Sequence, residues 1–315
     1  LTATAGATTV FVLQLNNTGD TSGATQSMTM TLSQPLDHAS AAGQNNLAIT
    51  VGYEVSDIDS AVSSSLTLNV TDDVPTPIDQ SDVTLAEGGV TVGSASGGVN
   101  LLTNDTQGAD GARVHTVTYN NASGVATTTA AIADGGNTGA LTTQYGSLTV
   151  HSDGSWSYTS AATSTTTTSV DHSVNGTDVQ DDFSYNIIDG DGDISASSAT
   201  QAIEVTDTGP VIGTPAGASV DEENLPTGAN ASPADLTQTG SLDVTKAADS
   251  IETQFTTATI TALDALNLTS ASQAMTYTIR NGGHTLTATE DGANTTVFTV
   301  YINNPTSNSA NYEFT

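Results

Sequence analysis

Hydrophobic and polar residues alternate with a period of two along much of the chain. Five runs show this most clearly, each rich in β-branched residues: residues 9–15, 65–70, 147–150, 202–205 and 296–302. Such alternation is typical of β-strands that bury one face. A helical pattern is weak, and its best segments, 249–255 and 263–268, are short. The pattern therefore predicts an all-β fold built from β-sandwiches.

The longer of two internal repeats links the two ends of the sequence. LTATAGATTVFVLQLNN at residues 1–17 matches LTATEDGANTTVFTVYINN at residues 286–304, with short gaps. Self-similarity at a long spacing indicates a chain built from tandem modules. We therefore expect the sequence to begin inside one module and to end inside another module of the same type.

A second repeat marks the junctions between modules. YEVSDID at residues 53–59 matches YNIIDGD at residues 185–191, and each leads through a strand pattern to Val-Thr-Asp and then to Pro75 or Pro210. Proline interrupts strand pairing and stiffens a linker. The expected modules are the C-terminal part of an Ig-like repeat at 1–75, a complete β-sandwich at 76–209 and the N-terminal part of the next repeat at 210–315.

The charge of the chain is strongly one-sided. Of 315 residues, 34 are acidic and only three are Lys or Arg, which gives a formal net charge of -31. Nucleic acids are excluded as partners, because binding them depends on basic side chains that neutralise phosphates. With no cysteine and no apolar run near the ~20 residues of a membrane span, neither disulfides nor direct membrane insertion is expected. The cations that balance the carboxylates must therefore come from solvent.

Three aspartates within five residues form the strongest candidate site. Asp189, Asp191 and Asp193 alternate with Gly190 and Gly192 in NIIDGDGDIS, and the glycines permit backbone angles that turn alternate carboxylates to one centre. Three carboxylates at one centre repel one another unless a cation lies between them. Calcium suits such a loop, because it takes oxygen ligands in flexible geometry. The loop lacks the Gly and Glu positions of an EF-hand, so further ligands must come from elsewhere in the fold.

The repeated junctions supply candidates for those further ligands. Each junction has a hairpin acid pair, an acid before the proline and an acid early in the next module. The first junction contains Asp57, Asp59, Asp72, Asp73 and Glu87, and the second contains Asp189, Asp191, Asp193, Asp207, Glu222 and Glu223. We expect the three loop aspartates to share their calcium ion, or an adjacent one, with Asp207 and Glu222 across the Pro210 boundary, which would lock the linker straight.

The hairpin acids of the first junction have two interpretations. Asp and Gly are ordinary turn residues, and the first junction has Ile58 and Ala61 where the fuller loop has Gly and Asp. Asp57 and Asp59 therefore fit either a metal site or a solvated turn.

Asp105 is a weaker candidate for a further metal site. It follows Leu-Leu-Thr-Asn, and Asp110-Gly111 comes close behind. An Asx turn explains the same pattern, so both interpretations stay open for Asp105.

Several stretches are similar to repeats of bacterial surface proteins. Residues 76–209 resemble a VCBS or cadherin-like repeat through LLTNDTQGADG, YGSLTVHSDGSWSYT, DDFSYNIIDGDGD and VTDTGP. The outer parts resemble the long repeats of type I secretion substrates through VDEENLPTGA, LAITVGYEVSDIDS and NVTDDVP. The whole chain is thus similar to the extension region of a giant RTX adhesin. That resemblance implies tandem calcium-bound β-sandwiches in a linear array, type I secretion and an extracellular, cell-surface location.

These observations favour a calcium-stabilised spacer that holds a distal binding domain away from the cell surface, with neighbouring repeats of the same polypeptide as partners. No catalytic motif is present, so an enzyme is not expected. One alternative is a calcium-dependent carbohydrate-binding module, which would need an exposed aromatic near the metal. Trp156 and Tyr158 fit either that role or a core strand. A second alternative is a filament subunit, in which the partial modules of neighbouring chains exchange strands through homotypic contacts.

Overall fold

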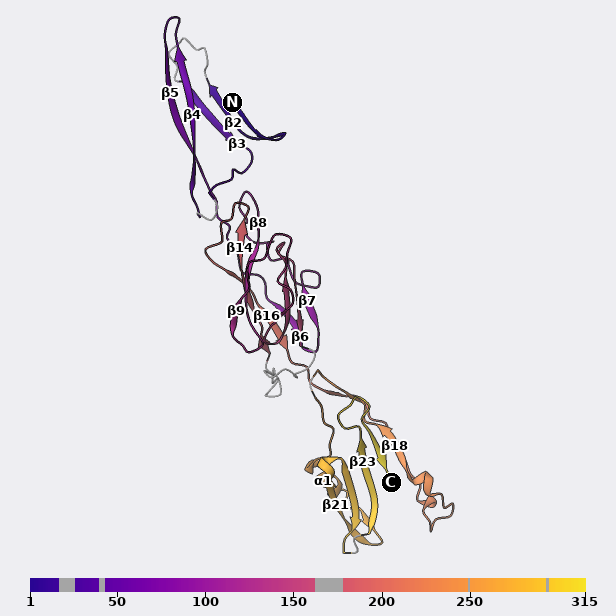
Figure 1. The fold of residues 1–315 in the computed structure, drawn as a ribbon. Coiled ribbons are helices and arrows are strands. Elements are labelled where there is room, and N and C mark those ends of the chain that lie inside the picture. The colour runs from indigo at the N-terminus through magenta and orange to yellow at the C-terminus, as the bar shows by residue number, and fades with distance from the viewer. Residues whose placement is uncertain (17–25, 40–42, 162–177, 249, 293–294) are drawn as a thin grey trace.

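The strands form three successive groups along an elongated molecule (Figure 1). This computed structural model describes residues 1–16, 26–39, 43–161, 178–248, 250–292 and 295–315. Every sheet among these residues is built from strands of a single expected module. The all-β fold class is confirmed, and each of the five alternating runs lies largely within a strand.

The first group consists of two small antiparallel sheets, a three-stranded sheet β1-β2-β3 and a long hairpin β4-β5. Its strands are β1 Thr2–Ala5, β2 Thr8–Asn16, β3 Ser27–Leu32, β4 Asn46–Ser56 and β5 Ala61–Thr71. Leu13 is the one buried hydrophobic residue among the described residues of this group. The first group therefore has little core of its own.

The middle group is a sandwich with a continuous core. Its sheets are β10-β11-β12-β7, β15-β14-β8-β9 and β13-β16-β6, in which β6 and β16 run parallel. Trp156 on β12 packs edge to face on Phe183 of β14, with ring centroids 5.6 Å apart, which joins two sheets. The strands are β6 Val83–Ala86, β7 Thr91–Gly93, β8 Ala112–Asn120, β9 Ala126–Thr128, β10 Leu141–Thr142, β11 Gly146–Val150, β12 Trp156–Ser160, β13 Val179–Gln180, β14 Phe183–Asp189, β15 Ala199–Gln201 and β16 Ile203–Thr206.

The third group has a six-stranded sheet in the order β18-β24-β23-β22-β21-β20 and a short ladder β17-β19. Its core is split into two small clusters, one around Tyr277 and Leu286 and one around Val244 and Ile251. The strands are β17 Val211–Ile212, β18 Gln238–Ser241, β19 Val244–Thr245, β20 Thr269–Ser270, β21 Gln273–Arg280, β22 Thr285–Glu290, β23 Thr296–Asn303 and β24 Asn311–Phe314.

The sequence repeat between the two ends of the chain is also a structural repeat. In the hairpin β1-β2, Ala3 lies opposite Phe11, and a register shift follows directly after Ala3. In the hairpin β22-β23, Ala288 lies opposite Phe298, and a register shift follows at the same place. Matching residues thus form the same bulged hairpin twice, as expected for two modules of one type.

The two weak helical patterns mark the position of the helix poorly. The one α-helix among the described residues is α1 Thr257–Asp264, which lies between the two predicted segments and overlaps only the start of 263–268. Its Thr and Ile residues give it a strand-like composition. A cap compensates, since the backbone N–H of Thr256 donates to the hydroxyl of Thr259 at 3.3 Å.

In the described parts of the chain, no helix combines the length and apolarity that crossing a bilayer requires.

Candidate metal centre

The acidic loop of the middle group follows β14 and lies at the end of the sandwich that faces the first group. Asp189, the last residue of β14, pairs with Ala112 at the start of β8. The backbone N–H of Asp189 donates to the carbonyl of Asp193 at 3.1 Å, which closes the loop. Gly192 has a φ of 105°, a left-handed conformation that glycine adopts without strain.

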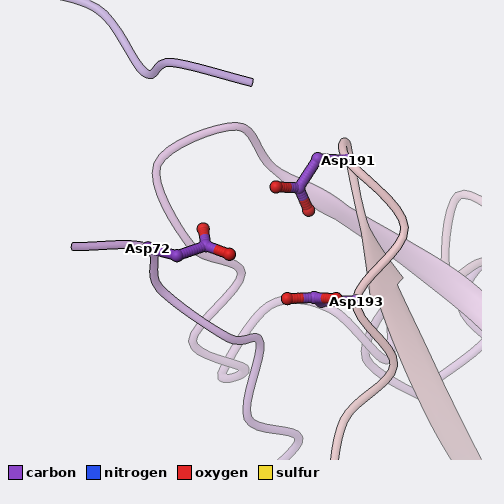
Figure 2. A group of neighbouring side chains, drawn as sticks. All are labelled: Asp72, Asp191 and Asp193. Atoms are coloured by element: carbon purple, nitrogen blue, oxygen red, sulfur yellow. The ribbon is translucent and has the colours of Figure 1, made fainter. Parts of the chain in front are cut away.

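Two loop aspartates meet an aspartate of the first group at the joint. Asp72, directly after β5, faces Asp191 and Asp193 (Figure 2), and one carboxylate oxygen from each lies within 4.8 Å of the others. Asp193 is 1% exposed and Asp72 is 8% exposed. The cluster is therefore largely shielded from water, and it draws on both sides of the joint.

Among the described residues, each loop aspartate has one oxygen that accepts hydrogen bonds and one that does not. Asp189 Oδ1 accepts from the N–H groups of Gly192 (3.0 Å) and Asp193 (2.6 Å). The other oxygens, Asp189 Oδ2, Asp191 Oδ1 and Asp193 Oδ2, are buried without a hydrogen-bond partner among the described residues. A buried anionic oxygen without a partner costs several kcal/mol. Three such oxygens in one loop form a set of ligand atoms that a bound cation would satisfy.

The first group supplies backbone donors to the same loop. The N–H of His38 donates to Asp191 Oδ2 at 3.2 Å, and the N–H of Gly43 donates to Asp193 Oδ1 at 3.0 Å. Asn45 Nδ2 donates to Asp72 Oδ2 at 3.1 Å. The bonds from His38 and Gly43 occupy the remaining oxygens of Asp191 and Asp193 and cross the joint, whereas the bond from the Asn45 side chain orients Asp72 within the first group.

Electrostatics oppose the cluster as long as no cation balances it. Two carboxylates whose oxygens lie within 4.8 Å of each other repel each other by about 3 kcal/mol or more at an effective dielectric constant near 20. Burial raises the pKa of Asp189 to about 7, and the charges of Asp191 and Asp110 add to the effect. Burial, followed by the charge of Asp191, also raises the pKa of Asp72. A divalent cation would reverse these penalties.

A second acidic group shares Asp191 with the first. Oxygens of Asp110, Asp189 and Asp191 lie within 4.8 Å of one another. Asp110 Oδ2 accepts from the N–H of Asp191 at 3.0 Å. A Cβ atom on Gly190 would lie 2.5 Å from Asp110 Oδ2, so any other residue here would displace the Asp110 carboxylate from its present position.

No family model matches the chain, and none of the curated proteins matches it. The chemistry of the site therefore has to be inferred from its own residues. Carboxylate oxygens from a flexible loop, with no thiolate and with imidazole absent from both acidic groups, form a donor set that suits calcium.

The expected partners Asp207, Glu222 and Glu223 do not lie at this loop, so that part of the prediction is wrong. Asp207 follows β16. The strand β15 runs antiparallel to β14, and Figure 1 shows that β16 then ends at the opposite end of the sandwich. Glu222 and Glu223 lie in an exposed 3-10 turn, Glu222–Asn224. That turn precedes β18 and lies beyond its end remote from the middle group (Figure 1).

The hairpin acids of the first group lie far from the linker acids that follow them. Asp57 and Asp59 are exposed at the tip of the hairpin β4-β5, whereas Asp72 follows its open end. An 11-residue strand spans roughly 35 Å, which separates the two sets. Asp57 Oδ1 accepts from the N–H and the hydroxyl of Ser60, both at 2.7 Å, and these bonds lower its pKa. The turn interpretation therefore fits Asp57.

The other candidates hold backbone segments in place. Asp73 Oδ2 accepts from the N–H of Ala109 at 2.8 Å, which ties the linker to the middle group next to the cluster. Glu87 Oε1 accepts from the N–H and the hydroxyl of Thr208, at 2.9 and 2.8 Å, at the far joint. Asp105 Oδ1 accepts from the N–H of Ile78 at 2.8 Å and from the hydroxyl of Tyr185 at 3.1 Å. Each contact stabilises the fold without any ion.

Sequence reasoning missed the backbone donors and gave Asp110 too little weight. His38 and Gly43 donate through their main chains, and no residue type marks such a role. Asp110 carried a weak signal, since it precedes a glycine in a loop. Trp156 and Tyr158 are both buried in the core, so neither is the exposed aromatic that a sugar site would need.

Proposed function

We propose that this chain is a calcium-stabilised spacer, the extension region of a large secreted adhesin. The observation that carries the proposal is the position of Asp72, which the first group contributes to a cluster otherwise formed by the middle group. An ion held by Asp72, Asp191 and Asp193 would fix the joint between two modules. A spacer keeps its full end-to-end length only if such joints are fixed.

Calcium is the ion that the donor set favours. Calcium accepts six to eight oxygen ligands in irregular geometry, whereas magnesium demands a near-ideal octahedron. Outside the cell, where the resemblance to type I secreted adhesins would place the chain, calcium is abundant. The scarcity of Lys and Arg, three against 34 acidic residues, favours external cations as the counter-charge.

The test compares the wild-type chain with Asp72→Asn, in calcium and in EDTA. Small-angle scattering should show a shorter average maximum dimension in EDTA, because the first joint then bends freely. The melting temperature should fall as well, since one ion at a hundred times its Kd stabilises the fold by about 2.7 kcal/mol. In calcium, Asp72→Asn should show the shorter average maximum dimension that the wild type shows in EDTA, because its first joint bends freely.

Asp82→Asn is the matched control, because it removes the same charge from an exposed position of the middle group. It should behave like the wild type. Scattering profiles that EDTA leaves unchanged in the wild type would refute the spacer proposal. Magnesium in place of calcium should restore little of the maximum dimension or the melting temperature.

A further inference from the structure

The loop after β14 contributes to two acidic groups, whose oxygens do not form a single set within 4.8 Å of one another among the described residues. Ligand oxygens around one calcium lie roughly 2.3–2.6 Å from it, and therefore within about 5 Å of one another. Two separate sets of three meet that limit among the described residues, one with Asp72 and Asp193 and one with Asp110 and Asp189. Asp191 belongs to both sets.

We propose that the acidic loop holds two calcium ions that share Asp191. The joint ion takes Asp72 and Asp193 as its other carboxylates. The inner ion takes Asp110 and Asp189, and it lies wholly within the middle group. This inference rests on the proposed calcium-stabilised joint and adds a second position to it.

An independent observation supports the inner position. Asp189 is 5% exposed, its Oδ1 is occupied by two backbone N–H groups, and its Oδ2 has no partner in the described part of the chain. Because Asp189 is not a member of the joint set, an ion at the joint alone would leave Asp189 Oδ2 unpaired. The inner ion would pair it.

The surroundings of the inner position suit an ion that completes its shell with water. A cavity of about 460 Å³, lined in part by Asp110, Asp189 and Asp134, opens beside it. Arg113 lines the same cavity, but its guanidinium donates to the carbonyl of Ile132 at 2.9 Å. No ion pair with a basic side chain involves these aspartates in the described residues.

The two positions have different structural requirements. The inner ion needs only residues of the middle group, so it can bind whether or not the first group is docked. By ordering Asp191, it would present that carboxylate to Asp72. Loss of the inner ion should therefore weaken the joint ion, whereas loss of Asp72 should leave the inner ion in place.

The test counts calcium ions per chain by equilibrium dialysis at saturating calcium, on the full chain. Relative to the wild type, Asp72→Asn and Asp110→Asn should each lose one ion, and Asp191→Asn should lose two. Asp82→Asn should lose none. Circular dichroism checks that each variant is folded, and the exposed Asp110 keeps the test valid if Asp191→Asn does not fold.

The outcomes separate this inference from the spacer proposal. An unchanged ion count in Asp110→Asn would overturn the two-ion inference, and the dependence of the maximum dimension on calcium could still stand. Loss of one ion in Asp110→Asn, with no effect of EDTA on the maximum dimension of the wild type, would uphold the inner ion and refute the spacer. Loss of only one ion in a folded Asp191→Asn would show that Asp191 does not bridge.

Discussion

At the scale of single residues, the acidic loop is defined by which carboxylate oxygens have partners. The loop fixes Asp189 through two short bonds from the backbone to Oδ1 and leaves Oδ2 buried, with no hydrogen-bond partner in the described part of the chain. A neutral, protonated carboxyl tolerates that environment better than an ionised one. Proton and calcium should therefore compete for Asp189, and pH should act in opposite directions with and without calcium.

In EDTA, the free energy of unfolding should fall as the pH rises from about 4 to about 7. The pKa of Asp189 is about 7 in the folded chain against an ordinary 3.8, so the folded state binds the proton more tightly. This stabilisation is on the order of a few kcal/mol. It is fully present below the pKa of the unfolded state and is lost as the pH rises through the pKa of the folded state. Urea denaturation at pH 5 and at pH 7.5 measures this change in the free energy of unfolding.

Asp189→Asn isolates this contribution from the repulsion among the other acids, because Asn stays neutral throughout. The variant should show a smaller loss of stability between pH 5 and pH 7.5 in EDTA. An equal loss in wild type and variant would contradict the assignment. In calcium the wild type should instead gain stability with pH, since the ion binds the ionised carboxylate.

The loop could be found from sequence because three aspartates stand close together in a chain that has almost no basic residues. The identity of their partners could not be found in the same way. The junction pattern placed Asp193 and Asp207 in one unit, but β15 and β16 lie between them and carry Asp207 to the other end of the sandwich. Two residues of one repeated motif can therefore lie at opposite ends of a sheet when strands separate them in the sequence.

At the scale of secondary structure elements, the loop after β14 depends on how closely Gly190 approaches Asp110. Gly190→Ala would place a Cβ atom 2.5 Å from Asp110 Oδ2 without a left-handed φ to strain. Asp110 is an exposed side chain and can move away at little cost. The substitution should therefore leave the melting temperature in EDTA nearly unchanged and weaken calcium binding at the inner position roughly tenfold, which is about 1.4 kcal/mol.

Calcium titration calorimetry measures this effect, with Gly209→Ala as the control. Gly209 has open space around its Cβ position and no left-handed φ, so its substitution should leave calcium affinity unaltered. Equal affinities in Gly190→Ala and the wild type would show that Asp110 does not bind the ion.

At the scale of the whole molecule, the two joints differ in kind. At the first joint, Asp72 of one group faces Asp191 and Asp193 of the next, and Asp73 accepts a hydrogen bond from the N–H of Ala109. At the second joint, Thr208 accepts from the N–H of Ala248 at 3.4 Å and donates to Glu87, and no acidic group of three is present there among the described residues. Calcium should consequently restrain the first joint and leave the second as it is.

Spin labels on introduced cysteines can test each joint separately, because the chain has no cysteine of its own. One pair, Ser65→Cys with Thr103→Cys, spans the first joint, and a second pair, Ser123→Cys with Thr239→Cys, spans the other; all four positions are exposed. Double electron–electron resonance should show that calcium narrows the distance distribution of the first pair of labels only. Asp72→Asn in the first pair should abolish the narrowing. Narrowing of both distributions would mean that calcium restrains the second joint as well, through ligands outside the two acidic groups.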